Sequence, residues 1–136
     1  MNKIQAERLL TLAWFLRTEV DPNKFNMYVY ADGFKLHACN TSGCALGWAT
    51  VCFPNLLRIA ERFGEPAIAP PRMRSVNFYS PYIQNLFGLT EKECHTAFSF
   101  IHKRTPKQEA VVLERLAKKH EWEYAAPLEK KRSYAK

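Results

Sequence analysis

Long apolar runs are missing from this sequence. No stretch approaches the roughly 18 uninterrupted apolar residues that a membrane span requires. Residues 1–10 carry mixed charges and lack both an apolar core and a cleavage site, so they do not look like a signal peptide. These absences predict a cytoplasmic protein without a membrane partner, in which the four cysteines remain free thiols.

Acidic residues are scarce as well: 13 Asp and Glu stand against 20 Lys and Arg, which gives a formal net charge of +7. Residues 127–136 hold four of those basic residues and one acidic residue. We therefore expect one globular domain over residues 1–126 and a basic, disordered tail over residues 127–136. The charge that remains on the domain is only a weak indication of a nucleic-acid-binding face.

Helix signals are strongest at the two ends of the chain. Asn2 can cap a first helix, which Asp21-Pro22-Asn23 ends, and its apolar face would hold Ala6, Leu9, Ala13, Leu16 and Val20. Cap signals at Ser80-Pro81, Thr90 to Glu93 and Thr105-Pro106 predict three closing helices. Apolar faces of the last two would hold Cys94, Ala97, Phe98 and Ile101, and then Ala110, Leu113, Ala117, His120 and Tyr124.

The middle of the chain predicts one small sheet. Residues 25–31 and 34–39 are expected to form a hairpin that turns at Asp32-Gly33. A helix from Thr41 or Ser42 to about Cys52 would follow, and then a short helix over residues 56–63, ended by Gly64. Residues 64–80 look irregular, with an edge strand over residues 75–79. The predicted fold is α+β and mainly helical, with five or six helices around a small antiparallel β-hairpin.

A metal site is one interpretation of residues 37–50, HACNTSGCALGWAT. His37, Cys39 and Cys44 are suitable zinc ligands. Cys52 would lie about 12 Å further along a helix from Cys44, too far to bind the same ion. The set therefore lacks a fourth ligand, and neither a metal nor another cofactor is expected.

Catalysis is a second interpretation. A thiol in the first turn of a helix has its pKa lowered by unpaired N–H groups and by the helix dipole, and Cys44 is placed to be that thiol. His37 would then act as its base. No third, orienting residue is evident, so a cysteine-dependent hydrolase or transferase stays an alternative.

Close packing is the favoured interpretation. Gly43 and Gly47, with Ala45 and Ala49, leave little bulk on two sides of the predicted helix, which lets another backbone or a ligand approach. Cys44 would then be a small buried side chain. A functional variant of this interpretation places an anion or phosphate on the N–H groups at the helix start, bound by Thr41, Ser42, Gly43 and Cys44.

Residues 39–49, CNTSGCALGWA, resemble the signature of a family of small bacterial and phage proteins. That signature is Cys-Gly-Thr, two residues, Cys, two residues, Gly, any residue and Ala, and here Asn40 replaces its first Gly. The segments 25–27, 86–90 and 97–98 resemble flanking motifs of the same family, so the likeness spans about residues 6–120. It implies a shared fold and a phage origin, and it leaves the function open.

Arg72 and Arg74 lie beside Phe78, Tyr79 and Tyr82, and such pairs of arginine and aromatic residues can grip phosphates and stack on bases. The sequence favours a non-enzymatic binding protein that acts on a host protein or a nucleotide-like, anionic ligand, as an inhibitor or anti-defence protein. Its candidate binding residues are Arg72, Arg74 and the helix start at 41–44. A nonspecific nucleic-acid binder is the remaining alternative.

Overall fold

The computed structural model describes residues 1–27 and 44–125. Over these residues the fold is α+β and mainly helical, with one two-stranded antiparallel sheet, which confirms the predicted fold class. The elements are α1 (Lys3–Thr18), the 3-10 helix η1 (Pro22–Lys24), α2 (Ala45–Cys52), β1 (Arg58–Arg62), β2 (Glu65–Ala69), α3 (Pro81–Phe87), α4 (Glu91–Phe98) and α5 (Pro106–Lys119). No helix of the described residues is long and apolar enough to cross a membrane.

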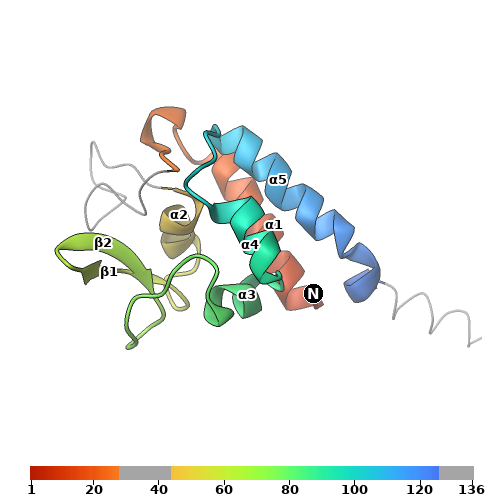
Figure 1. Ribbon diagram of the computed structural model, residues 1–136. Helices are drawn as coiled ribbons and strands as arrows, with labels where there is room; N and C mark the ends of the chain where they lie inside the picture. The colour runs from red at the N-terminus through yellow and green to blue at the C-terminus, as the bar shows by residue number, and fades with distance from the viewer. Residues whose placement is uncertain (28–43, 126–136) are drawn as a thin grey trace, which may run out of the picture.

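Helices α1 and α5 lie side by side, and α5 runs along an outer edge of the fold (Figure 1). Four residues of the predicted face of α1 are buried on the helix, namely Ala6, Leu9, Ala13 and Leu16. Val20 was expected on the same face and is buried, but it lies after the helix has ended at Thr18. Asn2 caps the helix in a capping box with Gln5. On α5 the buried face holds Ala110, Leu113 and Ala117. These small and medium side chains allow the two helices to pack closely into one core.

The predicted caps of the three later helices are confirmed. Ser80, Thr90 and Thr105 each accept a hydrogen bond from the backbone N–H three residues on. Gly88 ends α3 in the left-handed conformation, and a Cβ there would lie 2.9 Å from the Cα of Met1. Ile101 was expected on the apolar side of α4, but the helix ends at Phe98 and the Ile101 side chain is 75% exposed.

Strand β1 lies where a helix is expected from the sequence, and β2 lies in the segment 64–80 that is expected to be irregular. Residues 56–63 were expected to be helical, yet Arg58–Arg62 form β1 and pair with β2 through a two-residue turn at Phe63-Gly64. The pair Ile59 and Ile68 lies on the core side of this hairpin. Residues 75–79 are not a strand, although the N–H of Val76 donates to the Ile68 carbonyl. The hairpin predicted over residues 25–39 lies mostly outside the described residues.

Helix α2 lies between the hairpin and α1 (Figure 1). It begins at Ala45 with Cys44 as its N-cap. The expectation that Thr41 or Ser42 caps this helix is therefore wrong. Its residues from Ala45 to Ala49 are all buried. The small side chains of α2 therefore form a joint between two neighbours, as the packing interpretation predicts.

Candidate anion-binding cavity

A cavity of about 520 Å³ lies between the hairpin and the segment that follows β2. Its lining consists of Arg58, Ala60, Glu61, Arg62, Phe63, Met73, Arg74 and Ser75. Three arginines and one glutamate give this lining a net charge of +2. Its volume is within the range of small-molecule sites, so it suits a compact anionic ligand.

Strand alternation places the basic side chains of β1. Because successive residues of a strand point to opposite faces, Arg58, Ala60 and Arg62 share the face opposite Ile59. Arg58 also holds residues 70–73 against the hairpin. Its guanidinium donates to the Pro70 carbonyl at 3.2 Å and to the Met73 carbonyl at 2.6 Å. Arg58 therefore stabilises the shape of the cavity and also contributes positive charge to its lining.

Two residues beside this cavity hold left-handed backbone conformations that side chains disfavour. Phe63 has φ 53° at the hairpin turn, and Gly64 follows with φ 80°. This pair of positive angles in a two-residue loop is the pattern of a type I′ turn, where Asn or Gly is usual first. Arg72 has φ 60° after two prolines, the position that glycine favours in a type II turn. Backbone strain of this kind is often retained at functional sites.

The arginines at the cavity mouth are free to bind. Within the described part of the chain, no ion pair or hydrogen bond engages the guanidinium of Arg62 or Arg74. Arg62 lies over the ring of Phe63, with its central carbon 5.6 Å from the ring centroid. Phe63 is 94% exposed and Met73 is 57% exposed. The cavity thus combines unpaired positive charge with exposed apolar surface.

Cys44 does not have the properties of a helix-start nucleophile. The Cys44 thiol is buried. Burial raises the pKa of Cys44 to about 11, although backbone hydrogen bonds from Gly47 and Leu46 act in the other direction. The helix-start argument predicted a lowered pKa, and that expectation is wrong because desolvation outweighs the dipole. Cys44, Cys52 and Cys94 are free thiols.

The other predicted site residues divide into two groups. His37, Cys39, Thr41, Ser42 and Gly43 lie outside the described residues. Arg72 and Arg74 are exposed, and Arg74 lines the cavity while Arg72 holds the adjoining turn. No three His, Cys, Asp or Glu side chains of the described residues are grouped so that they could hold a metal ion.

Arg58, Arg62, Phe63 and Met73 were missed as site residues. The reason is the helix assigned to residues 56–63, which would have spread the arginines over different faces. A usable signal was present: Phe63-Gly64 separates two five-residue segments, RIAER and EPAIA, that have the length of hairpin strands. The glycine was read as the end of a helix, although it equally fits the second position of a hairpin turn.

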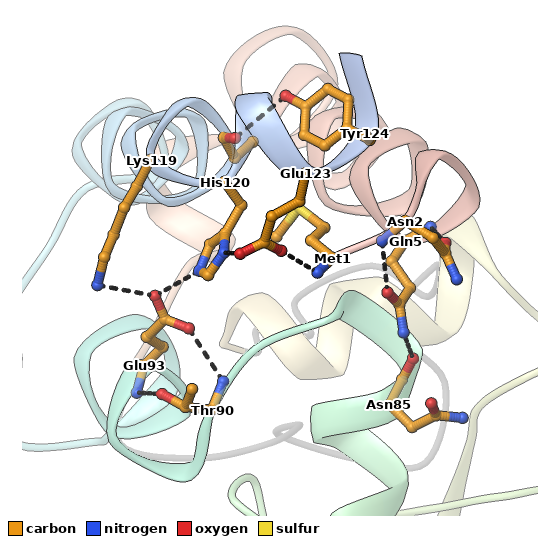
Figure 2. Close-up of polar contacts among 11 residues, drawn as sticks. Met1, Asn2, Gln5, Asn85, Thr90, Glu93, Lys119, His120, Glu123 and Tyr124 are labelled. Atoms are coloured by element: carbon orange, nitrogen blue, oxygen red, sulfur yellow. Dashed lines mark hydrogen bonds and ion pairs between the residues drawn. The ribbon is translucent and has the colours of Figure 1, made fainter. Parts of the chain in front are cut away.

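A second charged cluster joins the ends of α4 and α5 (Figure 2). Both ring nitrogens of His120 lie 2.8 Å from carboxylate oxygens, Nδ1 from Glu123 and Nε2 from Glu93. Lys119 also pairs with Glu93 at 3.1 Å, and the Met1 ammonium pairs with Glu123. Glu93 lies 27 residues before His120 in the chain, so their contact depends on how α4 and α5 pack.

The charges of this cluster are satisfied by one another. Burial alone raises the pKa of Glu93, but hydrogen bonds from the Thr90 N–H, His120 and Lys119 outweigh it and hold the pKa at about 2. Burial alone lowers the pKa of His120, while Glu123 and Glu93 outweigh it and raise it above the usual 6.5. Since these groups already pair with one another, the cluster ties α1, α4 and α5 together and is not the better ligand site.

Another cavity, of about 320 Å³, lies beside Lys103, Arg104 and the start of α5. Arg104 is already engaged there, because it donates to Oε1 of the buried Glu109 at 2.7 Å. Lys103 is thus the one unpaired cation among the described residues lining that cavity. With three arginines, the cavity beside the hairpin is the stronger candidate for binding an anion.

Comparisons with protein-family models, with curated proteins and with solved structures find no match to this chain. The resemblance of residues 39–49 to a family of small bacterial and phage proteins therefore stays a prediction.

Proposed function

We propose that this protein is a non-enzymatic binding protein for a small, phosphate-bearing ligand, which it holds in the cavity beside the β1–β2 hairpin. The observation that carries the proposal is the lining of that cavity, where Arg58, Arg62 and Arg74 gather around about 520 Å³ of space. Guanidinium groups bind phosphate oxygens through two parallel hydrogen bonds, which suits them to this ligand class.

The state of the arginines supports binding over a purely structural role. Arg58 is occupied in part by the carbonyls of Pro70 and Met73, and so it shapes the cavity. Among residues 1–27 and 44–125, Arg62 and Arg74 have no such partner, and we take their charge to be available to a ligand. Their arrangement contrasts with that of His120 and Glu93, whose charges are already paired. We assign phosphate contact to Arg62 and Arg74.

The cysteine-dependent enzyme is the weaker candidate. A nucleophilic thiol reacts as its thiolate, and the raised pKa of Cys44 keeps the thiol protonated at neutral pH. The anion-binding cavity also does not include Cys44. The burial of Cys44 supports a packing role for this residue, and we assign it no contact with the ligand.

The proposed biological setting comes from the sequence resemblance alone. Residues 39–49 resemble a signature found in small bacterial and phage proteins. On that basis we propose that the protein works in the cytoplasm and interferes with a host or defence process by sequestering a phosphate-bearing molecule or by binding a host protein that carries one.

Titration calorimetry with tripolyphosphate tests the binding proposal directly, at physiological ionic strength and with the full chain. Arg62→Gln and Arg74→Gln each remove one unpaired charge from the cavity, and each should weaken binding by about tenfold or more, because a charge-assisted hydrogen bond is lost. Arg115→Gln is the matched control, since Arg115 is exposed on α5 and lies outside the cavity lining. Its affinity should equal that of the wild type.

Two outcomes contradict the proposal. The wild type binding no tripolyphosphate would remove the phosphate site. Equal weakening by all three substitutions would show that the whole basic surface attracts the anion and that the cavity has no special part in binding.

A further inference from the structure

We infer that the ligand of this cavity is a nucleotide, whose phosphates contact Arg62 and Arg74 and whose base stacks on the ring of Phe63. The inference rests on the proposed function, because it names the ligand class of the same cavity. It comes from the conformation, exposure and surroundings of Phe63, none of which a ligand made of phosphate alone would need.

The Phe63 side chain contributes little to the stability of the folded protein. The side chain is 94% exposed, so its hydrophobic area is not buried against the protein. Its backbone has φ 53°, in the left-handed region that asparagine and glycine tolerate best. An aromatic residue at this position therefore combines backbone strain with exposure to water. Both costs are offset if the ring contacts a ligand.

One face of the Phe63 ring has a partner and the rest of the ring faces solvent. The guanidinium of Arg62 lies over the ring, 5.6 Å from its centroid. Because the side chain is almost fully exposed, a planar base has room to stack against the ring on the side away from Arg62. Arg62 therefore lies over one face of the ring, close enough to contact the phosphates of a nucleotide whose base stacks on the other face.

The rest of the cavity agrees with a ligand that has one charged end and one flat apolar end. Met73 adds a second exposed apolar side chain to the lining, and Arg74 adds a second cation that no ion pair within the described segments engages. Stacking on an aromatic side chain is tolerant of base identity, since every base has a π face. The lining thus fits nucleotides as a class and does not distinguish one base from another.

The test compares ATP with tripolyphosphate, both in the presence of EDTA, by titration calorimetry on the full chain. Tripolyphosphate carries the phosphates without the base. Wild type should bind ATP about tenfold or more tightly than tripolyphosphate, the gain expected from one stacked base. Phe63→Leu should bring the ratio of ATP affinity to tripolyphosphate affinity close to one, and Phe63→Tyr should keep the wild-type ratio. Trp122→Leu is the matched control, because Trp122 is 70% exposed on the helical turn after α5, away from the cavity.

The outcomes separate this inference from the proposed function. If wild type binds tripolyphosphate but binds ATP no more tightly, or if Phe63→Leu leaves ATP affinity unchanged, the nucleotide inference is wrong and the phosphate site stands. If neither ligand binds, both fail. Binding of a short single-stranded oligonucleotide far more tightly than ATP would also overturn the inference, in favour of a nucleic-acid interface.

Discussion

Replacing Phe63 by asparagine should make the protein more stable, although it removes a large side chain. The left-handed conformation costs an ordinary L-residue roughly 1–2 kcal/mol, and asparagine followed by glycine is the preferred pair in a type I′ turn. Phe63 has φ 53° and already precedes Gly64, so Phe63→Asn relieves the strain without moving the backbone.

The expected gain follows from what Phe63 contributes now. Its 94% exposure means that almost no buried area is lost on substitution. The contact with Arg62 is an exposed cation–π pair, worth about 0.5–1 kcal/mol. Subtracting the middle of this range from the middle of the range for the strain leaves a gain of about 0.7 kcal/mol in the free energy of unfolding. For a chain of this length, that corresponds to a rise of about 2–5 °C in Tm.

Thermal and urea unfolding, followed by circular dichroism, measure this change. Phe63→Leu is the control, because leucine keeps the backbone strain and loses the contact with Arg62, so its Tm should fall slightly or stay the same. Phe63→Asn should raise the Tm and, if the nucleotide inference is correct, weaken ATP binding in the same protein. A Phe63→Asn variant less stable than wild type would refute the strain argument.

Two further predictions concern buried groups. Burial raises the pKa of Glu109 from its usual 4.5 to about 8, against the lowering effect of Arg104, so native stability should fall as the pH rises from about 5 to 8. Glu109→Gln cannot ionise and should reduce that fall in Tm, and a pH profile identical to that of wild type would contradict the argument. Cys44 should resist iodoacetamide until the protein unfolds, and Cys44→Leu should lower the free energy of unfolding by ~1–3 kcal/mol through overpacking. Alkylation of native Cys44 ahead of the half-buried Cys52 would contradict this.

Local signals in the sequence predicted much of the helical frame. The caps at Asn2, Ser80, Thr90 and Thr105 were predicted correctly because each acts on a backbone group within the next turn of its own helix. The apolar face of α1 was predicted for a similar reason, since residues three and four apart must share one side of a helix. These features need no knowledge of what the helix packs against.

The hairpin and its cavity were decided by tertiary contacts. A segment such as RIAER suits a helix or a strand, and its pairing with residues 65–69 over the turn at Phe63-Gly64 selects the strand. The cavity then needs Arg58 to reach the carbonyls of Pro70 and Met73, at separations of 12 and 15 residues. No periodicity in one segment specifies such a contact.

The same distinction explains the charged cluster. His120 meets Glu93 only because the end of α5 packs against the start of α4, and Glu93 is positioned by its own capping box with Thr90. The sequence alone indicated that Glu93 lies in the first turn of a helix, but it placed His120 on the face of the last helix, whereas α5 ends at Lys119 and His120 is its C-cap. Only the packing of those helices decided that the carboxylate would be paired, since an ion pair depends on distance in space and the spacing along the chain does not determine that distance.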